Sequence, residues 1–517
     1  MRRARTNQFE YPCPNAALRF CFFRPASPYP LWYRCWQKSD WKGIRGFLRI
    51  RPSIYESETR LDMKRESHLP LVLKHYVNGG WTTSATTGVS VNPSDLDEPI
   101  GEYARADVRM VDAAVDAASA AWREWSRASA ARRARALDAI GGELHARRAE
   151  LGCLLAREQG KTLPEAIDEV VHAGRVFRVF AEEAAHQPGE PLGVVAVITP
   201  WSFPLAIPAA KIAAALSAGN CVVFKPAELV SGCAWALADI IDRSGLPAGV
   251  FNLVLGSGRV AGARLAANER VRAVSFTGSV TTGTSVLRAS AARQMKVDLD
   301  TGGNSALIVL NDANLSTAVD AAIEGAYGLN GQRRAASSKL IVEQGIRHAF
   351  TDALLTRLSA LRIDHALKKG TDIGPVSNDS QLQRNLDRVA MAIKEGAELI
   401  HGGRAIERET RGYFMEPALL LGKPEMQINR EDIFGPVAVV LAADDYAHAL
   451  NLANQTASGV PAPGAGLCTT SLKHARHFRR HSHSNRVTVN RPTTVAVGSD
   501  AECRPRSTTL RHSPRLC

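Results

Sequence analysis

The feature that most constrains the fold is an alternation of short apolar runs with longer helical segments between residues 191 and 279. The apolar runs are rich in Val and bounded by Gly or Pro, which is typical of strands buried on both faces of a sheet. Helical segments separate them, which predicts parallel strands joined by crossover helices. The strand candidates are residues 191–201 (PLGVVAVITPW), 221–226 (CVVFKP), 249–256 (GVFNLVLG) and 272–279 (RAVSFTGS).

A second run of the same kind begins at residues 305–310 (SALIVL) and continues through 337–343 (SSKLIVE) and 431–442 (EDIFGPVAVVLA). The pattern weakens after about residue 455. We therefore predict a doubly wound parallel sheet within residues 71–303 and a second α/β domain over 304–490. Residues 1–70 and 491–517 have no sustained apolar period, and we expect an irregular N-terminal extension and an irregular basic tail.

Local signals support these elements at two places. Asn78-Gly79-Gly80 indicates a hairpin turn between short strands. Gly160 follows a long helical stretch and is expected to cap it. Ligands of doubly wound sheets bind at the carboxyl ends of the strands, so the loops after the predicted strands are the places to look for a site.

The net charge of +13 at pH 7 is concentrated at the two ends of the chain. Residues 1–70 hold 14 Lys and Arg against 6 Asp and Glu, residues 470–517 hold 10 against 2, and the part between them is mildly acidic. A basic tail can bind polyanions without specificity, but a poorly ordered tail without a partner is the more common case. We expect no specific nucleic-acid partner.

Other features of the composition point to an ordinary globular protein. No apolar run reaches the roughly 18 residues that a helix needs to cross a bilayer, and the Arg-rich start leads into no apolar segment of a secretory signal. The nine Cys are scattered without a CxxC pair, which favours a reduced compartment over a disulfide framework. We expect a cytoplasmic protein without membrane contact and without a metal site.

Five loop sequences, met in order along the chain, carry a family resemblance. They are ITPWSFPLAIPAAKIAAALSAGNCVVFKPAE (198–228), SFTGSVTTG (275–283), GGN (302–304), GQRRAASSKLIV (331–342) and EDIFGPV (431–437). From about residue 74 to 490 the chain resembles the aldehyde dehydrogenase superfamily. The resemblance implies an aldehyde dehydrogenase-like α/β fold, with a doubly wound NAD(P)-binding domain over 71–303 and an α/β catalytic domain over 304–490.

Further phrases resemble one branch of that superfamily. KTLPEA (161–166), CAWALA (233–238) and LCTTSLKHARHFRRHS (467–482) look most like the bacterial 2,5-dioxovalerate (α-ketoglutaric semialdehyde) dehydrogenases. This implies that the ancestral reaction is the NAD-dependent oxidation of a semialdehyde to a carboxylate.

Lys225 and Glu228 follow a buried strand, where the ribose of a dinucleotide could lie. A carboxylate accepts hydrogen bonds from both ribose hydroxyls and repels a 2′-phosphate, so Glu228 favours NAD, with NADP possible. Without the neighbouring loops, a surface Lys and Glu that open a helix around Pro226 would be the more common explanation.

Other loops complete the expected cofactor site. Ser279 precedes a helix whose backbone N–H groups could meet a pyrophosphate. Asp432 stands where the family usually has a Glu that holds the nicotinamide ribose, and Phe434 is retained. Taken singly, the glycines of these loops could be simple turns. The whole predicted set is Ile198, Thr199, Trp201, Lys225, Glu228, Gly258, Gly262, Ser279, Asp432 and Phe434.

The catalytic residues depart from the family pattern. In the family, a Cys thiolate attacks the aldehyde, an Asn helps to hold the oxyanion, and a Glu activates the water that hydrolyses the thioester. Here the Cys position is Arg334, the Glu position is Asp300 and the Asn position is Ser202. The two conservative changes each cost about 10²-fold or more, whereas loss of a nucleophile in another covalent enzyme costs about 10⁶.

Arg334 therefore leaves three interpretations open. The chain could be a slow residual enzyme acting on a small-molecule aldehyde, a non-catalytic protein that holds NAD or pairs with an intact paralogue, or a non-functional gene product. If the Arg334 side chain pointed to solvent, position 334 would not correspond to the family's nucleophile and none of these three interpretations would follow from it.

Two segments that build oligomers in the family are altered. Residues 181–195 (AEEAAHQPGEPLGVV) pass from helix to strand without the family's β-hairpin arm, and the family's C-terminal PFGG-x-K-x-S-G segment is missing. An oligomer is expected for the family, but these changes make it doubtful here.

We expect the chain to assemble poorly, because lost partner segments leave strand edges and apolar patches exposed. Light scattering should show a heterogeneous or aggregating species. A single sharp dimer or tetramer would contradict this prediction.

Overall fold

The computed structural model describes residues 72–186, 190–291, 293, 295–456, 461–493 and 511–512. All of them belong to one compact unit, Ser67–Cys517. The predicted extension over 1–70 lies outside the described residues, as does most of 491–517. Within that predicted tail, Arg511–His512 form strand β19, which pairs antiparallel with β6 (Glu190–Pro191). This pairing involves two residues of the predicted tail, and the character of the tail as a whole stays a prediction.

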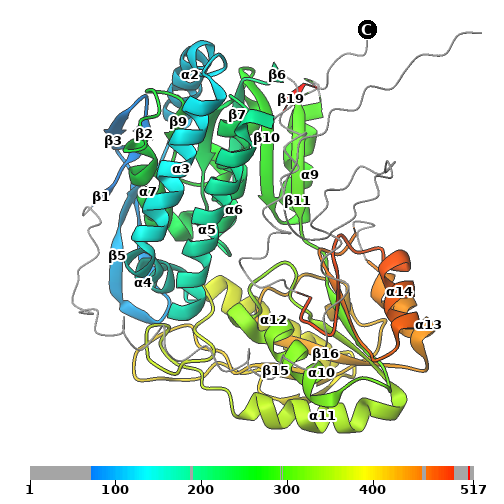
Figure 1. Cartoon of the computed structure of the whole chain (residues 1–517). Coiled ribbons are helices and arrows are strands. Elements are labelled where there is room, and N and C mark those ends of the chain that lie inside the picture. Colours follow the sequence, from blue (N-terminus) through cyan, green and yellow to red (C-terminus); the bar gives the residue numbers. More distant parts are fainter. Residues whose placement is uncertain are drawn as a thin grey trace, which may run out of the picture. The chain divides into compact units, whose positions relative to one another are not determined.

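The first large sheet has the strand order β11-β10-β7-β8-β9-β2-β3 (Figure 1). The strands from β11 to β9 are parallel, and β2 and β3 extend the edge as an antiparallel hairpin. Their bounds are β2 His75–Val77, β3 Gly80–Thr82, β7 Val194–Ile198, β8 Cys221–Lys225, β9 Phe251–Leu253, β10 Val271–Gly278 and β11 Lys296–Thr301. A smaller sheet joins β1 (Val72–Leu73), β5 (Asp95–Ala104) and β4 (Thr87–Asn92).

The predicted strands and turns of this region are confirmed. Every residue of β7 and β8 is buried, as expected for strands covered on both faces. The hairpin between β2 and β3 turns at Asn78 and Gly79, whose φ angles are 52° and 76°. Both values lie in the left-handed region that Asn and Gly tolerate best. Gly160 caps the end of α4 with a φ of 92°.

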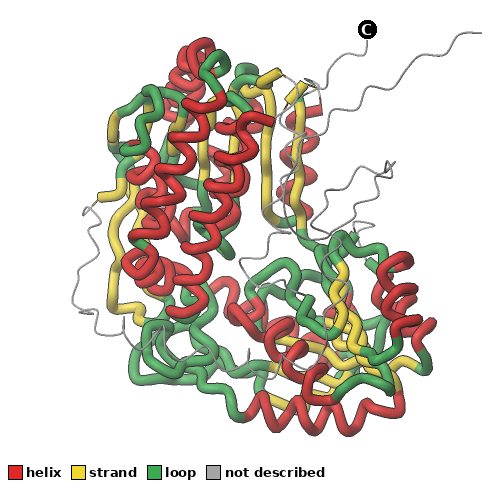
Figure 2. The backbone as a smooth tube through the Cα atoms, viewed as in Figure 1, coloured by secondary structure: helices red, strands yellow, loops and turns green. Residues whose placement is uncertain are grey.

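Helices cover both faces of the first sheet (Figure 2). The strand order reverses between β7 and β10, so right-handed crossovers place α6 and α7 on one face and α8 and α9 on the other. α3 and α5 pack on α6, and α2 packs with α8. The bounds are α2 Val108–Trp125, α3 Ala130–Ala146, α4 Arg148–Gln159, α5 Leu163–Glu183, α6 Ala206–Ser217, α7 Ser231–Asp242, α8 Ala263–Ala267 and α9 Val280–Ala291.

The second large sheet has the order β14-β15-β16-β13-β12-β17-β18, with β14 antiparallel at one edge. Its strands are β12 Ala306–Val309, β13 Lys339–Glu343, β14 Glu398–His401, β15 Ala418–Leu421, β16 Val437–Ala443, β17 Ala465–Cys468 and β18 Val487–Val489. Its helices are α10 Leu315–Ala322, α11 Gln344–Ser359, α12 Asp379–Lys394, α13 Tyr446–Asn454 and α14 Leu472–His481. The domain boundaries proposed from the sequence stay a prediction.

The regular structure continues beyond residue 455, where the sequence pattern fades. β17 has only one large apolar residue, Leu467, and Phe478 is the single buried residue of α14. Neither element therefore has a strong apolar period. Within the described part of the chain, no helix has the length and apolar character of a membrane span.

A buried carboxylate ties the helical layer of the first sheet together. Glu158 near the end of α4 is fully buried and accepts hydrogen bonds from the N–H groups of Gly232 (2.6 Å) and Cys233 (2.7 Å) at the start of α7. Ser90 of β4 donates a third, at 3.1 Å. Helix starts leave N–H groups without intrahelical partners, and Glu158 satisfies two of them.

We expect Glu158→Leu to lower the free energy of unfolding by on the order of 3 kcal/mol, because it leaves three buried donors without an acceptor. The urea midpoint of unfolding, followed by circular dichroism, measures the effect. Glu269→Gln, at an exposed position, serves as the control and should leave the midpoint unchanged. Equal midpoints for the two variants would show that Glu158 does not stabilise α7.

Candidate active site

The predicted cofactor loops leave the first sheet where its strand order reverses. β7 and β10 are neighbours at this reversal, which is the usual ligand position of a doubly wound sheet. Thr199 follows β7, and its N–H donates to the Lys225 carbonyl at 3.2 Å. The Thr199 hydroxyl is buried and has no hydrogen-bond partner in the described part of the chain. A buried hydroxyl of this kind requires a partner, which a bound ligand can supply.

Ser279 follows β10 at the same edge. Its hydroxyl oxygen accepts from the Thr282 N–H at 3.3 Å and so caps the first turn of α9. On the neighbouring loop, a Cβ built on Gly258 would meet nothing within 4 Å, and one on Gly262 would touch only Lys225. The protein's own packing thus does not require glycine at Gly258 and Gly262, and the space beside them is open to a ligand.

Lys225 ends β8 and is 4% exposed. Burial lowers the pKa of its ammonium group to about 8, against the opposing effect of Glu228. Glu228 itself accepts a hydrogen bond from the Tyr103 hydroxyl at 3.2 Å, and the Arg105 guanidinium lies 3.5 Å from the same carboxylate oxygen. The positive charge of Arg105 therefore partly balances the negative charge of Glu228, the residue from which we predicted a preference for NAD.

Sequence reasoning missed Tyr103 and Arg105. They stand at and just beyond the end of β5, more than a hundred positions before Glu228, and no local pattern joins them to it.

Trp201 and Phe434 come from the two large α/β regions and meet edge-on, with ring centroids 6.4 Å apart. Phe434 has a φ of 54°, an uncommon backbone conformation for a bulky residue that the surrounding structure must enforce. Asp432 lies two residues earlier, against Gly302, where any Cβ would clash with its carboxylate. Burial raises the pKa of Asp432, and Arg388 and Arg334 oppose the shift.

Ser202 lies in the loop between β7 and α6 and is buried. Its carbonyl accepts a hydrogen bond from the Lys161 ammonium group at 3.0 Å, and Lys161 forms a fully buried ion pair with Glu169 at 2.5 Å. Glu169 also accepts from the N–H groups of Leu205 (2.9 Å) and Ala206 (3.1 Å). Through these hydrogen bonds, the Lys161–Glu169 pair holds the backbone of the loop that contains Ser202. The sequence marked Lys161 only as part of KTLPEA, not as a contact of this loop.

The Arg334 side chain pairs with Asp300. Its Nη1 donates a hydrogen bond to Oδ1 of the carboxylate, and Thr277 Oγ1 donates to the other oxygen at 3.5 Å. The Arg334 side chain is 20% exposed and the Asp300 side chain 48%. Arg334 therefore does not point away into solvent.

The backbone before Arg334 has an unusual shape. Leu329, Asn330 and Gly331 have consecutive φ angles of 55°, 57° and 62°. A Cβ on Gly331 would clash with the Gly435 carbonyl. The loop is thus held against the segment that carries Phe434, and this brings Arg334 and Phe434 to one cavity.

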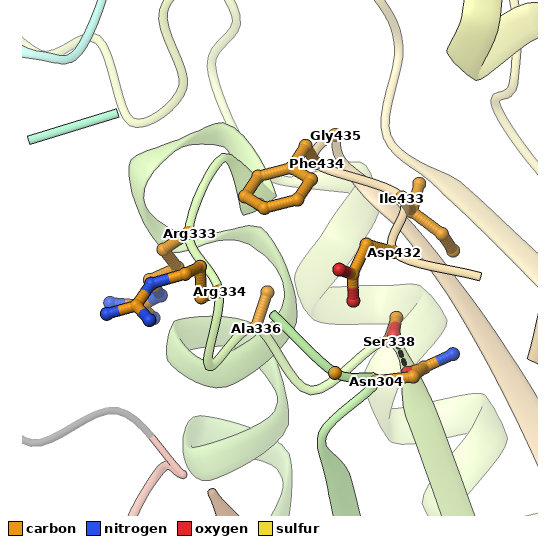
Figure 3. A pocket seen from close by; sticks show the side chains of 11 residues that line it. Asn304, Arg333, Arg334, Ala336, Ser338, Asp432, Ile433, Phe434 and Gly435 are labelled. Carbon is orange, nitrogen blue, oxygen red and sulfur yellow. Dashed lines mark hydrogen bonds between the residues drawn. The ribbon is translucent and has the colours of Figure 1, made fainter. Parts of the chain in front are cut away.

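That cavity is shown in Figure 3, where Arg333, Arg334, Asp432 and Phe434 surround it. Its free volume is about 10 Å³, close to the minimum that holds one water molecule. Ser202 is not among the residues that line it.

A second buried amine lies behind the site. Lys211 of α6 donates to Ser275 Oγ at 2.8 Å and lies 3.4 Å from Asp298 Oδ2. Burial lowers its pKa, although Asp298 and Asp300 oppose the shift. No sequence pattern marks Lys211 apart from its place in a predicted helix. The described residues contain no group of three or more His, Cys, Asp or Glu placed to hold a metal ion.

Known proteins match this chain over most of its length. The model of the aldehyde dehydrogenase family matches residues 81–501. The α-ketoglutaric semialdehyde dehydrogenase of Bacillus subtilis (strain 168) is 37% identical over 410 residues, which cover 75% of this chain and 84% of that protein. The α-ketoglutarate semialdehyde dehydrogenase of Haloferax volcanii is 36% identical over 444 residues, covering 81% of this chain and 91% of the relative.

Solved structures agree with this match. The NAD-dependent aldehyde dehydrogenase from Sinorhizobium meliloti superposes with a TM-score of 0.80 at 31% sequence identity, covering 84% of this chain and 90% of that one. The fold, the order of the loops and the sequence matches lead to one conclusion: the chain belongs to the aldehyde dehydrogenase family.

Proposed function

We propose that this chain is an NAD(P)-binding member of its family whose aldehyde oxidation is severely impaired. The observation that carries the proposal is the pairing of Arg334 with Asp300. One residue stands where the family has its nucleophile and the other where it has its general base. An always-charged guanidinium cannot attack a carbonyl carbon.

The residues around the strand reversal fit a dinucleotide. Lys225, Glu228 and the unpartnered hydroxyl of Thr199 would hold its polar groups, and the open space beside Gly258 and Gly262 would admit its adenosine end. The first turn of α9 after Ser279 would face the pyrophosphate. Ile198, Trp201, Asp432 and Phe434 would complete the pocket at the nicotinamide end. Bound NAD(P) would supply the hydride acceptor.

The chain's own residues would do less than the reaction needs. Ser202 could donate one hydrogen bond to an oxyanion. Asp300 would have to accept a proton from water, but its carboxylate is engaged by Arg334. The cavity beside Arg334 has room for about one water molecule. Binding and catalysis are therefore separable in this chain.

The ancestral substrate we propose is a small carboxylate-bearing semialdehyde. This rests on the two semialdehyde dehydrogenases that match the chain at 36–37% identity. The alternative is a wholly non-catalytic protein that holds NAD or pairs with an intact paralogue. The cytoplasm is the expected location.

Isothermal calorimetry on the purified chain should show NAD⁺ binding with a Kd between about 1 μM and 1 mM, the usual range of such sites. Lys225→Ala should weaken binding at least about tenfold, because it removes a buried charged donor. Lys394→Ala, at an exposed position on α12, is the control. No heat from a folded protein would refute the cofactor proposal.

The Arg334→Cys change should restore part of the chemistry. We expect wild type to give no burst of NADH with a semialdehyde, and Arg334→Cys to form a covalent adduct at residue 334 that intact-protein mass spectrometry detects. Arg334→Ser is the matched control, since it removes the same bulk and charge without supplying a thiol. Full turnover should further require Asp300→Glu and Ser202→Asn.

A wild-type rate in the ordinary range of about 1–10³ s⁻¹ would show that Arg334 does not replace an essential nucleophile.

A further inference from the structure

A second cavity lies in the other α/β region, between the sheet and α13. Its free volume is about 600 Å³, which is within the usual range for a small-molecule pocket. Lys339 begins β13, Asn429 and Arg430 come from the loop before β16, and His448, Leu452 and Gln455 belong to α13 and its end; all line the cavity. None of these residues lines the cavity at Arg334.

Lys339 contributes a buried amine to the lining of this cavity. Its residue is 3% exposed, and its Nζ donates one hydrogen bond, to the Gln455 carbonyl at 3.3 Å. Burial lowers the pKa of this amine to about 8, because removal from water disfavours the charged form. A lysine with the ordinary pKa of about 10.4 has a neutral fraction at pH 7.5 that is roughly a hundredfold smaller. Neutral amine with a free lone pair is what a carbonyl carbon reacts with.

Asn429 and Arg430, which line the same cavity, indicate which polar groups a ligand would carry. Asn429 donates from Nδ2 to the Lys423 carbonyl at 2.8 Å, which fixes the side chain, while its buried Oδ1 has no partner in the described residues. That oxygen can accept a hydrogen bond from a hydroxyl or amine group of a ligand. Arg430 offers a guanidinium suited to a carboxylate, and Glu425 lines the same cavity.

We propose that Lys339 is a covalent binding site for a small aldehyde that carries a carboxylate. The Nζ lone pair forms a bond to the carbonyl carbon, and the carbonyl oxygen takes up a proton to give a carbinolamine. Asn429 Oδ1 accepts the hydrogen bond of the new hydroxyl, and Arg430 holds the carboxylate. Loss of that hydroxyl as water leaves an imine between Nζ and the former carbonyl carbon. The step needs no oxidant or reductant.

The site is independent of the proposed cofactor function and extends beyond it. A protein that has lost its thiol nucleophile would still capture aldehydes of the same chemical class at a different nucleophile. NAD⁺ has no contact with this cavity in the proposal, so it should protect Lys225, the other buried lysine with a pKa near 8, but not Lys339.

The test is reductive trapping of the folded full-length chain. Glyoxylate and cyanoborohydride at pH 7.5 convert an imine to a stable secondary amine, which peptide mass spectrometry assigns to one lysine. We expect Lys339 to be labelled at least about tenfold faster than the exposed Lys394, with or without NAD⁺. Urea should abolish this difference. Equal labelling of the two residues, or an unlabelled Lys339 in folded protein, would overturn the proposal.

Two variants separate the amine from the carboxylate contact. Lys339→Arg should remove the adduct and leave NAD⁺ binding unchanged by calorimetry. Arg430→Gln should slow labelling of Lys339 by glyoxylate severalfold but not by propanal, which has no carboxylate. If Arg430→Gln slowed both probes equally, the assignment of the carboxylate would be wrong; if neither slowed, the ligand class would be wrong.

Discussion

Burial of the parallel strands on both faces is the constraint from which the arrangement of the first site follows. Strands such as β7 and β8 have no solvent-facing side, so helices must cover both faces and crossovers must have one hand. Hydrogen bonds between neighbouring strands define the strand order, and the direction of that order reverses between β7 and β10. Thr199 and Ser279 follow these two strands and so stand at the switch point of the sheet, where ligands of doubly wound sheets bind.

Local chemistry explains why much of this was predictable from sequence. The buried strands, the Asn78-Gly79 turn and the Gly160 cap are each determined by a few adjacent residues. Lys225 is the last residue of the buried strand β8, and Ser202 lies in the loop that follows the buried strand β7. β17 and α14 were less visible, because small or strongly polar residues make up most of them.

The contacts that tune the site were not predictable in this way. Arg105 beside Glu228, and Lys161 beneath Ser202, join positions far apart in sequence, and each needs the completed fold to be recognised. The same holds for Lys339, which in the sequence is one residue of a strand. Burial, not residue type, gives its amine a lowered pKa. The sequence shows directly that residue 334 is Arg, but the pairing of Arg334 with Asp300 is seen only in the folded structure.

The left-handed run of Leu329, Asn330 and Gly331 has a consequence for the residues that follow it. A non-glycine residue such as Leu329 pays about 1–3 kcal/mol for this conformation and keeps it only where packing enforces it; at position 331 the Gly435 carbonyl leaves no room for a side chain. The shape of this loop is therefore set by backbone packing on both sides and does not depend on which side chain follows it. A different side chain at position 334 would therefore leave the path of the backbone from Leu329 to Gly331 unchanged.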